Sequence, residues 1–181
     1  MTVMKKFLLA LCILVGVMGR SQGVNGALDA ALLTQANAMG KAFVSKDYSA
    51  FIKYSHPVVV SMMGGHDKML SDTQESFRTF EEQGVSFINV TFSAPSKILE
   101  SEGELQTTFT EIIEMRIPGG KLTAYAKVIA LSKDNGAHWY FIDSTDHPIE
   151  MMRKIIPSLH PDLELPQHME ASFEQDTNPK P

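Results

Sequence analysis

The sequence predicts an α+β protein built around a curved antiparallel sheet, and two observations in residues 86–144 carry this prediction. The first is that four stretches are typical of β-strands, at 86–99, 105–117, 121–132 and 138–144. The second is that glycine-containing pairs separate them, namely Glu102-Gly103, Gly119-Gly120 and Asn135-Gly136. Two-residue hairpin loops need positive φ, which glycine and asparagine adopt readily, so the four stretches are expected to form a meander.

The same loops predict the register of the sheet. They pair residue 101 with 104, 118 with 121, and 134 with 137. Because side chains alternate between the two faces of a strand, this register gathers apolar residues on one face. One row across that face reads Ala94, Glu111, Val128 and Asp143. Strand spacing then puts the two carboxylates about 10 Å apart.

Helices are expected before the meander. Apolar residues recur at helical spacing over 27–44 and over 67–83, which predicts two amphipathic helices. Asn25 is the expected N-cap of the first helix, and Gly84 suits the C′ position of the second. Asp47 is the expected N-cap of a short helix that ends before Pro57.

Three further segments complete the domain. The run Val-Val-Val-Ser-Met-Met at 58–63 predicts a short buried strand, stopped by Gly64-Gly65. Pro95 has no N–H to donate, so strand 86–99 is expected at an edge of the sheet. Residues 148–156 predict a short helix after the meander.

The two ends of the chain differ from the domain, which we assign to residues 24–156. Residues 1–23 combine Lys5 and Lys6 with an apolar run and then small residues, which is typical of a signal peptide. Cleavage after Gly23, after Gly19 or near Gly26 fits this layout, so the protein is expected to be secreted or periplasmic and free of the membrane. Residues 157–181 are rich in proline and predict an extended, disordered tail.

Charge and cysteine content exclude some classes of function. Cleavage removes Lys5, Lys6 and Arg20 and no acidic residue, which changes the net charge from −5 to −8. An acidic protein is a poor partner for nucleic acid, whose phosphates require a basic surface. The only cysteine, Cys12, lies in the leader, so the mature domain is expected to have no disulfide.

The order of these elements resembles the nuclear-transport-factor-2-like superfamily. The resemblance covers residues 27–146 and ends in the strand Trp139-Tyr140-Phe141-Ile142-Asp143. It implies a cone-shaped α+β roll, in which a strongly bent antiparallel sheet wraps around the N-terminal helices and encloses a cavity. The superfamily includes ketosteroid isomerases, dehydratases, polyketide cyclases, ligand binders and partner-binding modules, so the fold leaves the function open.

Glu111 and Asp143 are the candidate catalytic residues, because both lie on the apolar face of the predicted meander. A carboxylate on such a face loses hydration, so its pKa rises and it can act as a general acid or base near neutral pH. The resemblance implies that catalytic acids and bases line the interior of the cone. The alternative is that the bend of the sheet exposes one of them, or that hydrogen bonds satisfy it.

The candidate ligand-binding residues are apolar side chains on the same face and two loop histidines. They are Trp139, Phe141, Phe92, Val128, Met115, His56 and His66. Histidine titrates in the neutral range, although a solvent-exposed loop histidine needs no functional role. No cofactor and no metal site is predicted, because no histidine occurs at a metal-binding spacing such as H-E-x-x-H.

Three functions fit this sequence. The first is an exported ligand-binding or accessory module whose apolar cavity takes a small apolar ligand. The second is a cofactor-independent isomerase, dehydratase or hydrolase that uses Glu111 or Asp143 as its base. The third is a structural or interaction protein that acts through the outer face of the sheet.

The outer, convex face of the sheet also predicts a homodimer. It carries six large apolar or aromatic side chains: Ile112, Tyr125, Ile129, Leu131, Tyr140 and Ile142. A contiguous apolar patch is rarely left in water, and a two-fold dimer would bury it against its own copy. The alternative is that the tail folds back over the patch with Leu159, Leu163 and Leu165.

Overall fold

The structure is a computed structural model that describes residues 21–177. The predicted signal peptide lies almost entirely outside these residues. The N-terminal helices are α2 (Ser21–Val44), α3 (Tyr48–Ile52), α4 (Pro57–Met62) and α5 (His66–Glu82). The strands are β1 (Ser86–Phe92), β2 (Leu99–Ser101), β3 (Glu104–Ile117), β4 (Gly120–Ser132) and β5 (Tyr140–Asp143). Helix α6 (Ile149–Ile155) and strand β6 (Ser172–Gln175) follow.

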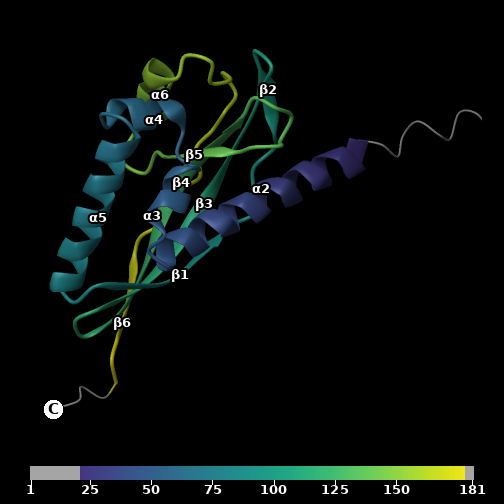
Figure 1. Ribbon diagram of the computed structural model, residues 1–181. Helices are drawn as coiled ribbons and strands as arrows, with labels where there is room; N and C mark the ends of the chain where they lie inside the picture. The colour runs from purple at the N-terminus through teal and green to yellow at the C-terminus, as the bar shows by residue number, and fades with distance from the viewer. Residues whose placement is uncertain (1–20, 178–181) are drawn as a thin grey trace, which may run out of the picture.

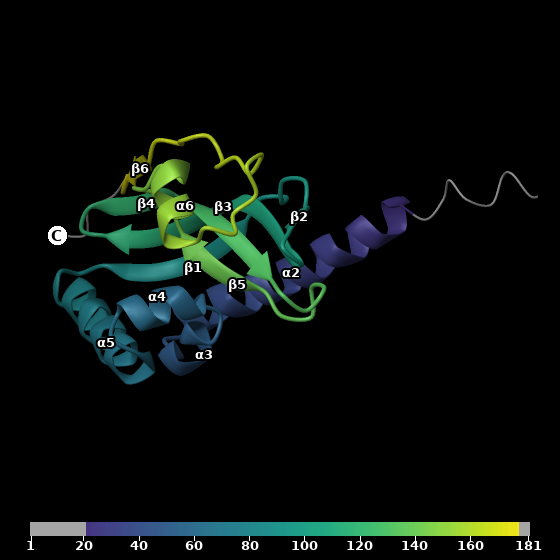
Figure 2. The ribbon, with the colours of Figure 1, turned by 90° about the horizontal axis from the view of Figure 1, so that it is seen from above.

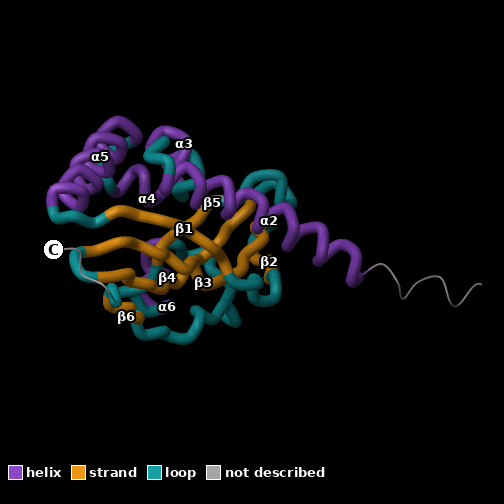
Figure 3. The backbone as a smooth tube through the Cα atoms, turned by 90° about the horizontal axis from the view of Figure 1, so that it is seen from below, coloured by secondary structure: helices purple, strands orange, loops and turns teal. Residues whose placement is uncertain are grey.

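The elements form three layers around an antiparallel sheet. Helices α2 to α5 cover one face of the sheet, while α6 and the C-terminal segment lie on the other (Figures 1, 2 and 3). The order along the sheet is β1-β3-β4-β5; β2 also pairs with β3, and β6 also pairs with β4. The predicted α+β class with an antiparallel sheet and N-terminal helices is confirmed.

Two of the three predicted hairpin registers are confirmed. Ser101 pairs with Glu104, and Val128 pairs with Asp143 as the 134–137 loop requires. The register between β3 and β4 was predicted wrongly by two residues, because Ile117 pairs with Gly120. The loop is therefore Pro118-Gly119, in which proline fixes a negative φ and Gly119 has a φ of 89°, as a type II turn requires. A shift of two residues leaves every side chain on its predicted face.

The predicted strand 86–99 is divided into β1 and β2, and Pro95 lies in the gap between them. In β1, Phe92 rather than Ala94 pairs with Glu111, and this offset of two residues arises in the gap, because Leu99 of β2 pairs with Gln106 as predicted. Both short strands pair only with β3 among the described strands. They therefore form an edge of the sheet, where a residue without an N–H is tolerated.

The prediction of a strand at 58–63 is wrong, because this segment forms helix α4. Pro57 is its first residue, a position where proline costs no hydrogen bond. His56 is the N-cap, and its Nδ1 accepts a hydrogen bond of 3.3 Å from the N–H of Val58. A favourable start thus outweighs the strand preference of the three valines.

The other helix ends were predicted with mixed success. Asp47 caps α3 as expected, and its carboxylate accepts a 3.0 Å hydrogen bond from the N–H of Ala50. Gly84, with a φ of 77°, follows α5 at the predicted C′ position. The predicted N-cap at Asn25 is wrong, because α2 begins at Ser21 and Asn25 lies within it.

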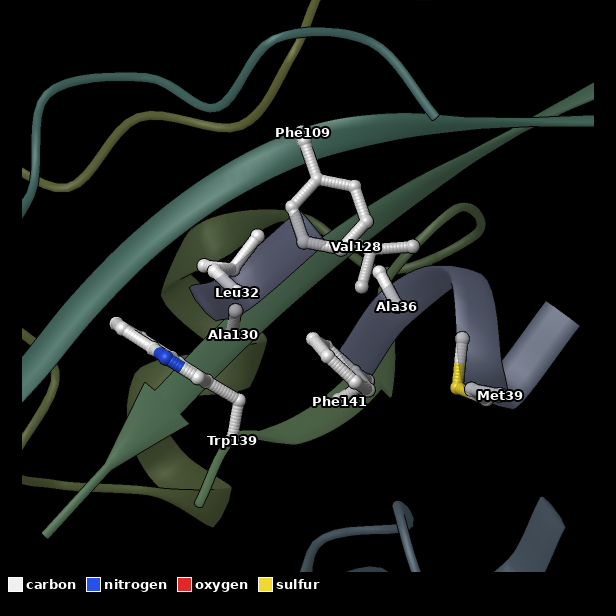
Figure 4. Packing of buried hydrophobic residues seen from close by; sticks show 8 residues of the cluster. All are labelled: Leu32, Ala36, Met39, Phe109, Val128, Ala130, Trp139 and Phe141. Atoms are coloured by element: carbon white, nitrogen blue, oxygen red, sulfur yellow. The ribbon is translucent and has the colours of Figure 1, made fainter. Parts of the chain in front are cut away.

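The main core lies between α2 and the sheet. Figure 4 shows its buried side chains: Leu32, Ala36, Met39, Phe109, Val128, Ala130, Trp139 and Phe141. Gln35 fixes α2 to the β4–β5 loop, because its side chain accepts a hydrogen bond from the N–H of Trp139 and donates one to the carbonyl of Ala137. A Cβ at Gly40 would lie 3.0 Å from Val90, so glycine allows α2 to approach β1 closely.

A second core covers the opposite face of the sheet. Ile129, Leu131 and Ile142 are buried there beneath six residues of α6 and the segment after it: Met152, Ile155, Ile156, Leu159, Leu163 and Leu165. The prediction of a disordered tail is therefore wrong for residues 157–165. Proline-rich chain can still be ordered when its leucines are buried and its polar groups are bonded, as they are here.

Polar contacts hold this C-terminal segment in place. The Gln106 side chain is fully buried; it donates a hydrogen bond to the carbonyl of Ser158 and accepts one from the N–H of His160. The Arg153 guanidinium donates to the carbonyls of His160, Pro161 and Leu163. Three of the six residues of the apolar patch that predicts a homodimer, Ile129, Leu131 and Ile142, are thus covered by the chain itself, while the other three stay half-buried. The homodimer stays a prediction.

Candidate functional site

A cavity of about 290 Å³ lies between the helical layer and the sheet. Helices α2 to α5, strands β3 to β5 and the turn before α4 contribute its lining. The lining residues are Met39, Phe43, Phe51, Ser55, Val59, Met69, Glu111, Ile113, Val128, Phe141, Ile142 and Asp143. This volume is at the lower end of the range for small-molecule sites.

The lining is mainly apolar, and three of its residues are phenylalanines. Phe43 and Phe51 lie with their ring centroids 5.4 Å apart, and Phe141 packs edge-on against Phe109 with centroids at 5.8 Å. These contacts fix the rings, because Phe43 also packs against Phe77 and Phe87. The wall of the cavity is therefore preorganised around a space lined by aromatic and aliphatic carbon.

Glu111 is a half-buried carboxyl group within this apolar lining. It lies in the middle of β3, where its neighbours across the sheet are Ala126 on β4 and Phe92 on β1. Burial, and secondarily the negative charge of Asp143, raises the pKa of Glu111 from its ordinary value of 4.5 to about 7. No cation or hydrogen-bond donor of residues 21–177 contributes to this shift. The carboxyl group is therefore unpaired and half ionised near neutral pH.

Asp143 lies at the end of β5, where the cavity reaches solvent. Its side chain is exposed, and its carboxylate accepts hydrogen bonds from the N–H and the hydroxyl of Thr145, at 2.8 Å and 2.6 Å. The predicted row containing both carboxylates is wrong, because Val128 stands opposite Phe109 rather than Glu111. Glu111 and Asp143 still lie on the same face of the sheet, because Glu111 is two residues along β3 from Phe109, which is in the same row as Asp143. Both acids line the cavity.

The predicted ligand-binding residues are distributed differently from expectation. Val128 and Phe141 line the cavity, whereas Trp139 and Phe92 belong to the adjoining core. Met115 lies toward the far end of β3, opposite Phe87 and Leu122, and is outside the lining. The core residues were misassigned because a sheet face continues beyond the part of it that a cavity occupies.

Neither predicted histidine lines the cavity. His56 is buried as the N-cap of α4, with its ring 6.0 Å from the ring of Tyr140, and burial lowers its pKa. His66 is exposed at the start of α5, where its Nδ1 lies 3.3 Å from a carboxylate oxygen of Asp67. His56 therefore serves as a helix cap, and His66 lies on the surface of the protein.

The lining residues missed by the sequence come mainly from helices. Met39, Phe43, Phe51 and Met69 all occur in apolar helical stripes, which identify buried faces but not which residues border a cavity. Val59 was missed because its segment was predicted as a strand. Ile113 is two residues from Glu111 on the same face of β3, so the alternation of side chains was the signal that could have found it.

In residues 21–177, no group of three or more histidine, cysteine, aspartate or glutamate side chains is arranged to hold a metal ion. None of the helices formed by those residues is long and apolar enough to cross a membrane.

Known proteins give no indication of function, so the proposal below is based on the cavity. No model of a known protein family matches the chain, and no curated protein matches it significantly.

Proposed function

We propose that this protein binds a small, largely apolar molecule in the cavity between its helices and its sheet. The observation that carries the proposal is an unpaired Glu111 carboxyl group within an apolar lining. Leaving a carboxyl group there without a partner costs free energy of folding, which a ligand that bonds to it would offset. Glu111 is then the group that orients the ligand, and the phenylalanines and methionines supply the contact area.

We also propose that the domain is a nuclear-transport-factor-2-like roll that is exported by a signal peptide. The order of helices α2, α3 and α5 followed by an antiparallel meander supports the roll, as does the cavity between the two layers. The basic and then apolar composition of residues 1–23 supports export. Mass spectrometry of the mature protein tests the second point, since an intact Met1 on the accumulated protein would contradict cleavage.

A blocked cavity tests the binding proposal. Ile113 lines the cavity from β3, so Ile113→Trp should fill part of the space and abolish binding of apolar fragments detected by NMR. Ile112 is the preceding residue of β3 and points to the opposite face, so Ile112→Trp is the matched control. Equal fragment binding by both variants would contradict the proposal, as would a wild-type protein that binds no fragment.

A second candidate is a cofactor-independent enzyme in which Glu111 removes a proton from a bound substrate. The observation that favours it is the raised pKa of Glu111, because a general base is most effective when its pKa is near the operating pH. In D₂O, such an enzyme should exchange the hydrogens next to the carbonyl of 4-phenyl-2-butanone, and Glu111→Gln should abolish the exchange. The Glu114→Gln variant is the control, since Glu114 instead pairs with Lys121 on the outer face. Exchange that is the same in all variants would exclude this candidate.

A further inference from the structure

The charges around the cavity are all of one sign. Among residues 21–177, Glu111 from β3 and Asp143 from β5 are the only ionisable residues of the lining, and no lysine, arginine or histidine of these residues contributes to it. Helices α2, α3, α4 and α5 contribute only Met39, Phe43, Phe51, Val59 and Met69, none of which titrates. A ligand therefore meets two carboxyl groups and no positive charge of the cavity wall.

This charge balance discriminates between classes of ligand. An anion, or a substrate that develops an oxyanion, would be repelled by Asp143 and by ionised Glu111. A neutral ligand would leave the negative charges uncompensated. A cation would pair with both, and the faces of Phe43, Phe51 and Phe141 attract cations through their ring quadrupoles.

We propose that the cavity selects a monovalent organic cation, an ammonium group attached to a compact apolar body. The ammonium group lies between Glu111 and Asp143, and the apolar body lies against the phenylalanines. A free metal ion is a poorer fit, because no group of three or more metal-ligating side chains is found in the part of the chain that the structure describes. The inference rests on the proposed binding function and names its ligand class.

The inference predicts a dependence of binding on pH. An ammonium ligand favours the ionised form of Glu111, so it should bind more tightly as the pH rises through the pKa of that group, about 7. In the described part of the chain, Asp143 is the only other titratable residue that lines the cavity. A neutral ligand of the same shape gains nothing from ionisation of Glu111 and should show no such increase.

The test compares phenethylammonium with 2-phenylethanol by isothermal titration calorimetry on the full mature protein. Phenethylammonium should bind about tenfold more tightly at about pH 8.5 than at about pH 5.5, and the alcohol should not. Glu111→Gln should remove the pH dependence, and Asp143→Asn should weaken ammonium binding without altering the fold. Glu114→Gln is the matched control for loss of a carboxylate, because Glu114 lies on the opposite face of β3 and should leave binding unchanged.

The outcomes separate this inference from the function on which it rests. Tighter ammonium binding that is lost in the Glu111 and Asp143 variants supports both. Equal binding of the amine and the alcohol, independent of pH, would overturn the charge selectivity and leave apolar binding intact. If neither compound binds and the Ile113→Trp experiment also shows no binding site, both proposals fail.

Discussion

Burial of the Glu111 carboxyl group lowers the stability of the folded protein near neutral pH. Its pKa is about 7 in the folded protein and 4.5 as an ordinary glutamate, so the folded state binds the proton more tightly than the unfolded state. Stability is therefore highest below about pH 4.5 as far as this group is concerned, and it falls as the pH rises from 4.5 to about 7. The full effect corresponds to roughly 3 kcal/mol as an upper bound.

Glu111→Gln should remove this loss, because an amide stays neutral. We expect the variant to be more stable than the wild type at about pH 8 by about 1–3 kcal/mol, with the difference vanishing near pH 4. Urea unfolding at several pH values measures it. Glu114→Gln should give no comparable gain, because Glu114 is bonded to Lys121 and Asn89 in the folded state. A wild-type stability that does not change between these pH values would contradict the prediction.

The charge of Asp143 should raise the pKa of Glu111. The negative charge of Asp143 is the second cause of the raised pKa of Glu111, so Asp143→Asn should lower that pKa while burial keeps it above 4.5. Carbon-13 NMR of the glutamate side chains follows the titration directly. Asp146→Asn, an exposed change three residues away, is the control. An unchanged Glu111 titration in the Asp143 variant would mean that the two groups are not coupled.

The β4–β5 loop shows how a short connection fixes the position of an element. Asp134 accepts hydrogen bonds from the N–H and the ring of His138 and from the hydroxyl of Ser132, and these bonds lower its pKa to about 2. Asn135 and Gly136 have φ values of 57° and 86°. The loop therefore fixes the register of β5 against β4, which places Trp139 in the core and Asp143 at the cavity.

Gly136→Ala tests the loop. An alanine would be strained at this φ, and its Cβ would lie 2.5 Å from a methyl carbon of Leu28 on α2. We expect a loss of about 1–3 kcal/mol in the free energy of unfolding. Gly103→Ala is the matched control, because Gly103 has a φ of 76° but no atom within 4 Å of the added carbon. Equal losses in the two variants would show that contact with α2 does not matter.

The C-terminal segment should keep the whole molecule from associating through its sheet. Leu159 and Leu163 cover Ile129, Leu131 and Ile142 within one chain. A chain that ends at Ile156 should expose this face and self-associate, because apolar patches of this kind seek a partner. Light scattering at micromolar concentrations should show a larger particle for the shortened chain than for the full mature chain.

A chain that ends at Ala171 is the control for this truncation. It lacks only β6 and the residues after it, and all four residues of β6 are exposed. It should scatter light like the full mature chain, because the leucines that cover the sheet remain. A full chain that already dimerises through this face would contradict the intramolecular cover.

The local pattern of the sequence was sufficient for the class of fold and for the two faces of the sheet. Hairpin pairs such as Asn135-Gly136 and the alternation along 105–117 placed Glu111 and Asp143 on one apolar face, because these signals depend on neighbouring residues alone. The error of two residues between β3 and β4 preserved those faces. It arose because two adjacent glycine-containing pairs, Pro118-Gly119 and Gly119-Gly120, were both suitable turns.

Tertiary structure decided the rest, because it depends on contacts between distant segments. The three valines of 58–60 became helical once His56 and Pro57 started a helix beside β5, and Val59 then reached the cavity. The first part of the tail is ordered because Leu159 and Leu163 pack against an apolar face formed by residues of β4 and β5. The cavity lies where helices α2, α3 and α5 leave space next to Glu111. The periodicity of apolar residues predicts which face of a helix is buried, but it does not predict such a space.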